Sequence, residues 1–294
     1  MTVPARPARP TPLFADIADV SRRLAETGYL ADTATATAVF LADRLAKPLL
    51  VEGPAGVGKT ELARAVAQAT GSGLVRLQCY EGVDEARALY EWNHAKQILR
   101  IQAGSGDWEA TKTDVFSEEF LLQRPLLTAI RRTEPTVLLI DETDKADIEI
   151  EGMLLEVLSD FAVTVPELGT LTAERAPFVL LTSNATRELS EALKRRCLFL
   201  HIDFPSPELE RRILLSRVPE LPEHLAEELV RVIGVLRGMQ LKKLPSIAET
   251  IDWGRTVLAL GLDTIDDAVV AATLGVILKH QSDQHRAAGE LRLN

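Results

Sequence analysis

The sequence contains few cysteines and few aromatic residues, and it lacks an excess of positive charge. Only two of its 294 residues are cysteines, aromatic residues make up 5%, and the formal net charge is −10. Cys79 and Cys197 do not have the spacing of metal ligands, so we expect neither a disulfide framework nor a zinc ribbon. The acidic balance gives no general attraction to a phosphate backbone, and we therefore expect no nucleic-acid partner.

Long apolar runs are also missing. No run approaches the roughly 20 residues that a membrane-spanning helix needs, and the first twelve residues lack the apolar centre of a signal peptide. We therefore expect a cytoplasmic protein without stable membrane insertion. Residues 1–12 alternate proline with arginine and small residues, a composition that predicts a flexible tail.

The remaining chain has the pattern of an α/β fold. Short apolar runs at 49–51, 74–79, 137–140, 178–181 and 198–202 predict five buried parallel strands. Helical patterns precede and separate them, which favours a doubly wound sheet with helices on both faces. Beyond residue 205 the pattern is helical only. We therefore expect an α/β core at 13–205 and an all-helical lid domain at 206–294.

The first motif that carries chemistry follows the first predicted strand. Residues 53–60 read GPAGVGKT, a full match to the phosphate-binding P-loop pattern GxxxxGK[ST], placed between a strand and a helix. Lys59 is expected to hold the β- and γ-phosphates of ATP, and Thr60 to ligate Mg²⁺. The alternative is an ordinary glycine-rich turn. The predicted nucleotide-binding residues here are Gly53, Pro54, Ala55, Gly56, Val57, Gly58, Lys59, Thr60 and Glu61.

The second motif is an apolar strand that ends in two carboxylates, Asp141 and Glu142. It has the Walker B pattern, in which Asp141 stabilises magnesium and Glu142 polarises the attacking water. A strand end of this kind is by itself often only a solvated terminus, but its place downstream of a P-loop favours the functional interpretation. A water-activating glutamate fits hydrolysis better than phosphoryl transfer to a small acceptor.

A third apolar strand ends at Asn184, which can hydrogen-bond the attacking water or the γ-phosphate; turn chemistry is the alternative. Together the three motifs resemble the AAA+ class of P-loop NTPases, in which this asparagine is called sensor 1. The resemblance implies an arginine finger before the fifth strand, with Arg196 as the candidate and Arg195 as the fallback. A solvated basic cluster is the alternative interpretation of these arginines.

Within AAA+ proteins the chain resembles the MoxR branch. The resemblance rests on an extra segment near 84–120, similar to a helix-2 insert, and on residues near 162–174, similar to a pre-sensor-1 hairpin. The run at 77–93, LQCYEGVDEARALYEWN, is similar to CoxD-type proteins. This similarity implies a hexameric ring, a partner with a von Willebrand factor A domain, and a protein client such as a molybdenum-containing hydroxylase of the carbon monoxide dehydrogenase kind.

The chain departs from that branch at one position. The lid stretch at 246–253 has no arginine where sensor 2 is expected, and Arg255 is the nearest candidate. This departure keeps open a nucleotide-gated scaffold that binds ATP with little turnover, or an AAA+ remodeller with a different client. Glu142, Asn184 and the helical C-terminal region argue against a small-molecule kinase, and the acidic charge argues against a DNA-directed motor.

Overall fold

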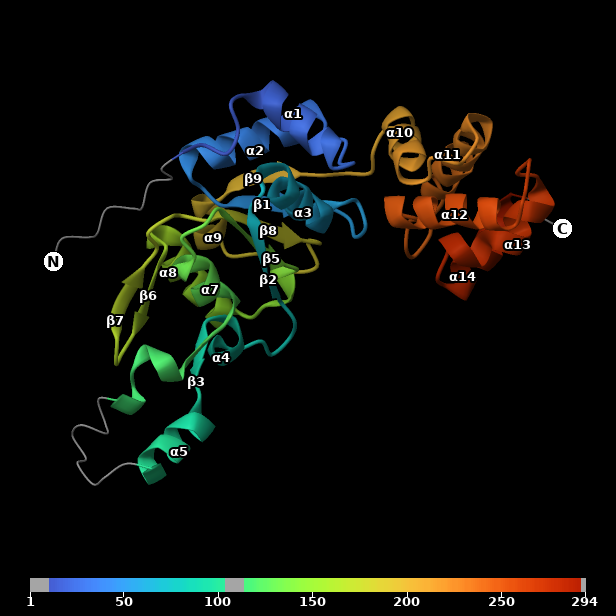
Figure 1. Cartoon of the computed structure of the whole chain (residues 1–294). Coiled ribbons are helices and arrows are strands. Elements are labelled where there is room, and N and C mark those ends of the chain that lie inside the picture. Colours follow the sequence, from blue (N-terminus) through green and yellow to red (C-terminus); the bar gives the residue numbers. More distant parts are fainter. Residues whose placement is uncertain (1–10, 104–113, 292–294) are drawn as a thin grey trace. The chain divides into compact units, whose positions relative to one another are not determined.

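A computed structural model describes residues 11–103 and 114–291, and its centre is a parallel sheet of five strands (Figure 1). The strands lie in the order β2-β5-β8-β1-β9. The predicted fold class, an α/β P-loop fold with a five-stranded parallel sheet, is confirmed. In chain order the five strands are β1 (Leu49–Glu52), β2 (Gly73–Gln78), β5 (Thr136–Asp141), β8 (Phe178–Ser183) and β9 (Leu198–His201).

The expectation that all five strands are buried is wrong at the two edges. Every residue of the central strands β5 and β8 is buried, whereas β2 and β9 alternate between covered and exposed positions. Phe199 of β9, for example, is 58% exposed. An edge strand has a neighbour on one side only, so its side chains are covered less completely. Because β2 pairs with the central strand β5, the polar side chains of β2 lie next to β5.

Helices cover both faces of the sheet. On one side α1 (Ile17–Glu26) packs on α2 (Thr33–Leu45), and α2 contacts β1 and β9. Asp16 and Asp32 begin these two helices by accepting a hydrogen bond from a first-turn amide, which satisfies a donor with no partner inside the helix. The other helices around the sheet are α3 (Lys59–Thr70), α7 (Pro125–Arg131), α8 (Ile148–Asp160) and α9 (Glu191–Arg196).

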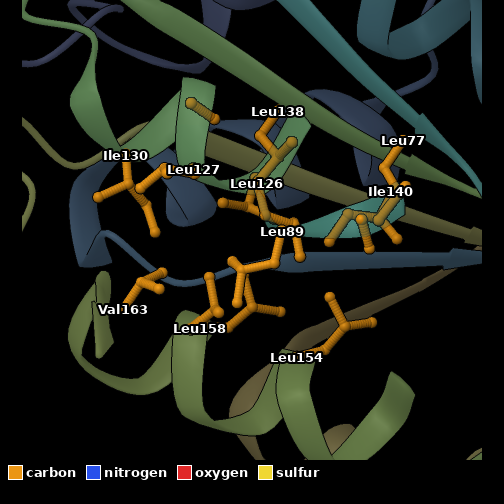
Figure 2. Packing of buried hydrophobic residues seen from close by; sticks show 14 of the residues in the cluster. Leu77, Leu89, Leu126, Leu127, Ile130, Leu138, Ile140, Leu154, Leu158 and Val163 are labelled. Atoms are coloured by element: carbon orange, nitrogen blue, oxygen red, sulfur yellow. The ribbon is translucent and has the colours of Figure 1, made fainter. Parts of the chain in front are cut away.

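The main core lies where α7 and α8 pack on the sheet (Figure 2). Leu126 and Leu127 of α7 are fully buried, and Leu154 of α8 and Ile140 of β5 belong to the same cluster. Burying each such side chain contributes roughly 1.5–3 kcal/mol, which fixes the two helices on the sheet whose strand β5 ends at the Walker B carboxylates.

Two short antiparallel strand pairs extend from this core. The first pairs β3 (Tyr90–Trp92) with β4 (Leu121–Gln123) and is accompanied by α4 (Glu85–Ala88), α5 (His94–Ala103) and the 3-10 turn η1 (Glu118–Phe120). The expected insert at 84–120 falls here, although residues 104–113 lie outside the described residues. The second pairs β6 (Ala162–Val165) with β7 (Gly169–Thr172), inside the stretch expected to form a hairpin.

The chain forms two compact units, and the second contains residues 202–294 together with Gly28–Leu30 and Gly53–Lys59. Its core is built around Trp253, which is fully buried and donates its indole N–H to Thr273 at 2.8 Å. Across the described residues no helix is long and apolar enough to span a membrane. The helices are α10 (Pro207–Arg217), α11 (Glu223–Arg237), α12 (Ile247–Ala259), α13 (Asp267–Ile277) and α14 (Gln281–Glu290).

Candidate nucleotide site

The predicted P-loop connects β1 to the first turn of α3. Gly53 has a φ of +155°, and a Cβ atom built there would lie 1.9 Å from the carbonyl oxygen of Ile202, so only glycine fits. Gly58 has a φ of +100° directly before α3 begins. The buried Lys59 folds back over the loop, and its ammonium donates to the carbonyl oxygens of Gly53 and Pro54 at 2.6 and 2.7 Å.

The Walker B aspartate, Asp141, lies at the end of β5 and is 2% exposed. Its Oδ1 accepts from the hydroxyls of Thr60 and Thr182 at 2.9 and 2.6 Å. Its Oδ2 accepts two bonds from the Arg76 guanidinium, from Nε at 3.1 Å and from Nη2 at 2.5 Å. A carboxylate has about four acceptor positions, so the hydrogen-bonding capacity of Asp141 is filled by these three side chains.

The next residue, Glu142, has a left-handed backbone with φ 56° and ψ 47°. Its amide donates to the hydroxyl of Thr182 at 2.8 Å, so this one hydroxyl joins both Walker B residues to β8. The Glu142 carboxylate accepts from Gln78 Nε2 at 3.0 Å and from Lys145 Nζ at 2.6 Å. A left-handed non-glycine residue costs of order 1 kcal/mol or more, and such strain clusters at functional positions.

Asn184 follows β8, which is the direct neighbour of β5 in the sheet, so Asn184 and Glu142 come after the carboxyl ends of adjacent strands. The segment after Asn184 is tied to the segment after Glu142. Thr186 donates its amide and its hydroxyl to Oδ2 of the buried Asp144, at 3.0 and 2.5 Å. Burial raises the pKa of Asp144, but hydrogen bonds from Thr186, the Asn184 backbone and its own backbone together outweigh it, and the net pKa lies below the usual value.

An ion pair with the buried Glu151 fixes the same segment a few residues further on. Arg187 donates to Glu151 of α8 at 2.5 Å and to the carbonyl oxygen of Ala146 at 2.6 Å, and the Ser190 amide donates to Glu151 at 2.9 Å. Burial alone raises the pKa of Glu151, but the bonds from Ser190 and Arg187 lower it on balance. These contacts hold the loop that carries Asn184 beside the end of β5.

The predicted arginines are at exposed positions of their helices. Arg195 and Arg196 are the exposed last residues of α9, and Arg196 donates to the hydroxyl of Ser159 at 2.5 Å. Arg255 is on α12 in the second unit, 62% exposed and 3.5 Å from Asp252. The finger assignment and the sensor 2 assignment therefore stay predictions.

The side chains present fit a nucleotide phosphate and magnesium. The positive-φ glycines before the amino end of α3 form a loop whose backbone can approach an anion closely, with Lys59 as its cation. The Thr60 hydroxyl and the Asp141 carboxylate, 2.9 Å apart, are the hard oxygen donors that Mg²⁺ prefers. Nearby Cys79 is buried, and burial raises its pKa to about 12, so it is no thiolate ligand.

The sequence-based prediction missed four side chains that contact the Walker B carboxylates, namely Arg76, Gln78, Lys145 and Thr182. Arg76 and Gln78 lie two residues apart on β2 and therefore on one face of that strand, and Gln78 is the register partner of Asp141. Their alternation with Val75 and Leu77 was a signal in the sequence that this strand has one polar face, but not that this face meets the carboxylates. Thr182 had no such signal, since it stands inside an apolar strand.

Together, the parallel sheet, the P-loop and the paired carboxylates define a P-loop ATP hydrolase domain. Residues 48–197 match the family model "AAA domain (dynein-related subfamily)", which is about half of the chain. The chain belongs to this family.

Several curated proteins are similar over most of the chain. Chaperone protein ClpB of Chlamydia pneumoniae is 24% identical over 219 residues, which is 70% of this chain but 23% of ClpB. Protein NorQ of Paracoccus denitrificans is 24% identical over 236 residues, covering 77% of this chain and 78% of NorQ. The chain therefore spans about a quarter of the length of ClpB and most of the length of NorQ.

Solved structures agree on the fold. A RuvB mutant from Thermotoga maritima superimposes with a TM-score of 0.50 at 16% identity, covering 98% of this chain and 75% of the RuvB chain. At this level of identity the likeness concerns the fold only.

Proposed function

We propose that this protein is a magnesium-dependent ATPase that uses hydrolysis to remodel a protein client. The observation that carries the proposal is the contact between Thr60 of the P-loop and Asp141 of the Walker B strand, with Glu142 next to Asp141. Oxygen donors and a second carboxylate at the end of a P-loop sheet suit the hydrolysis of a nucleoside triphosphate.

Each side chain has a role in this proposal. Lys59 binds the phosphates, and Thr60 and Asp141 hold magnesium, which neutralises phosphate charge when bound. Glu142 accepts a proton from the attacking water, and Asn184 orients that water. Gln78 and Lys145 both donate to Oε2 of Glu142, so Oε1 is the oxygen that accepts from the water in this proposal.

The proposed client is a protein. ClpB, a relative over 70% of the chain, carries the name of a chaperone, and AAA domains commonly act as oligomers. We propose a hexameric ring in which Arg196 reaches the nucleotide of a neighbouring subunit, where an arginine is worth roughly 10³–10⁵ in turnover. The acidic net charge of −10 favours a protein over a nucleic acid as the client.

The finer proposal is a MoxR-type, CoxD-like role in maturing a molybdenum-containing hydroxylase, in the cytoplasm and with a von Willebrand factor A partner. It is supported by the run at 77–93, by α5 and β3 within the segment expected for the insert, and by the β6–β7 hairpin within 162–174. In this proposal the domains are an ATPase core at 13–205 and a lid at 206–294; residues 1–10 of the tail predicted at 1–12 lie outside the described residues.

A nucleotide-gated scaffold is the second candidate. Lys145 and Gln78 both donate to Oε2 of Glu142, and these two bonds restrict how the carboxylate can turn toward a water. A scaffold of this kind would assemble with ATP but would turn over very slowly, whereas the remodeller would do both.

Mixing inactive variants tests the proposal. Lys59→Ala removes the phosphate cation and Arg196→Ala removes the finger, so neither variant alone should hydrolyse ATP. If sites are shared between subunits, an equal mixture regains turnover, because some interfaces combine an intact P-loop with an intact finger. Arg195→Ala, which removes the neighbouring arginine of α9, is the control variant. The molecular mass of each protein in the presence of ATP is measured in parallel. A monomer with ATP, or a mixture as inactive as its components, would contradict the ring.

A further inference from the structure

The side chain of Arg76 occupies the carboxylate that the proposed function assigns to magnesium. Arg76 is 43% exposed, whereas its partner Asp141 is almost fully buried, and both bonds to Oδ2 come from the one guanidinium. The same Nη2 atom also donates to the side-chain oxygen of Gln78, whose amide donates to Glu142. Arg76 is therefore linked to both Walker B acids.

This contact matters for metal binding because the hydrogen-bond acceptor positions of Asp141 are already filled. The Thr182 hydroxyl accepts a hydrogen bond from the Glu142 amide and donates its own proton to Oδ1 of Asp141, so it cannot turn away from Oδ1 without losing both bonds. Thr60 can turn its hydroxyl away, which frees one position on Oδ1 only. Oδ2 stays covered by Arg76, and the charge of Asp141 stays neutralised by a cation at 2.5 Å.

We propose that Arg76 is the internal counter-ion of Asp141 and competes with magnesium for it. Without metal, Arg76 stabilises a carboxylate that is buried beside hydroxyls and apolar strands, with which it forms an ion pair at 2.5 Å. When magnesium and nucleotide occupy the site, Arg76 gives up its bonds to Oδ2, because two cations on one carboxylate repel each other. Arg76 is thus a positioning residue that sets how much magnesium the site requires.

The bond to Gln78 extends this role to Glu142. Gln78 holds the Glu142 carboxylate with its amide while its oxygen accepts from Arg76. When Arg76 leaves Asp141, Gln78 loses a partner on one side, and Glu142 is held less firmly. The proposal rests on the proposed ATPase function, since it assumes that Asp141 serves magnesium.

The test is a magnesium titration of nucleotide binding, which does not depend on turnover. Binding of a fluorescent ADP analogue to the full chain is followed as Mg²⁺ is added, for the wild type, Arg76→Gln and Arg76→Lys. Arg76→Gln should lower the Mg²⁺ concentration at half-saturation on the order of tenfold, the scale of one charge pair in a partly exposed setting. Arg76→Lys keeps the charge and should stay near the wild-type value.

Two controls separate this role from a structural one. Arg124→Gln removes an arginine of similar exposure that pairs with Glu91 at 2.6 Å, and it should leave the magnesium midpoint unchanged. In Asp141→Asn, adding Arg76→Gln should cause no further shift, because Arg76 acts through Asp141. Melting temperatures add a second readout: Arg76→Gln should melt lower than the wild type without metal, and the gap should narrow with Mg²⁺ and ADP.

The outcomes are distinguishable. If the wild type binds the analogue but Arg76→Gln needs as much magnesium as the wild type, or more, Arg76 does not compete with the metal, and the ATPase proposal stands. If Arg76→Gln does not fold, Asp141→Asn carries the test: a magnesium midpoint that Asp141→Asn leaves at the wild-type value would overturn the competition. A wild type that binds no nucleotide at any magnesium concentration overturns both proposals.

Discussion

The Thr182 hydroxyl offers a precise perturbation of the site. Thr182 lies in β8 and is 2% exposed. Its hydroxyl donates to Asp141 Oδ1 at 2.6 Å and accepts from the Glu142 amide at 2.8 Å. Thr182→Val keeps the shape of the side chain and removes both hydrogen bonds. The Glu142 amide then has to find another partner beside a left-handed backbone.

The expected loss can be worked out from these two bonds. A hydrogen bond to a charged group contributes about 1.5–3 kcal/mol, and a bond to a neutral amide about 1 kcal/mol. Thr182→Val should therefore lower the free energy of unfolding by about 3 kcal/mol. Thr182→Ser is the matched control, because it keeps the hydroxyl and loses one buried methyl group, at about 1 kcal/mol.

The assay is urea unfolding, in which the m-value should be the same for all variants, together with ATP turnover. Because the hydroxyl positions both Walker B acids, Thr182→Val should also reduce turnover more than Thr182→Ser does. If the two variants differ by less than about 0.5 kcal/mol, the hydroxyl does not join the strands energetically, and the reasoning from these two bonds is refuted.

Two further changes test the surroundings of the site. Glu151→Gln should lower the free energy of unfolding at pH 7 by about 2 kcal/mol, since it weakens the bonds from Arg187 and Ser190. The native pKa of Glu151 lies below its ordinary 4.5, so this difference should be constant above pH 4.5 and shrink as the pH falls through the native pKa; a pH-independent difference would contradict the assignment. Gly53→Ala should abolish nucleotide binding while the circular dichroism spectrum stays folded, because its Cβ would meet the Ile202 carbonyl oxygen. Unchanged binding in that variant would show that the loop tolerates a side chain.

The fold and the motifs were predictable where the signal is local. The P-loop letters, the apolar run before Asp141 and the alternation of strands and helices depend on neighbouring residues, and the sheet follows from them. The burial of the edge strands was not predictable in this way. Whether β2 lies at an edge depends on the strand order, and the sequence patterns used do not contain that order.

The partners of the carboxylates were beyond sequence reasoning for the same reason. The contact between Arg76 and Asp141 joins residues 65 positions apart, and it exists because β2 pairs with β5 in a particular register. The Lys145 bond to Glu142 is local, but it depends on the left-handed turn at Glu142. Motifs therefore identify which residues carry the chemistry, whereas topology decides which side chains restrain them.

The most direct test of the central claim is the rate of magnesium-dependent ATP hydrolysis by the wild type and by Glu142→Gln, with nucleotide affinity measured on both. Glu142→Gln keeps the size of the side chain and removes the carboxylate that is proposed to accept the proton from water. The account predicts that the variant binds ATP as tightly as the wild type and hydrolyses it at least 100-fold more slowly, the scale of general-base catalysis at roughly 10²–10⁴. Equal turnover in the two proteins, or no magnesium-dependent turnover in the wild type, would contradict it.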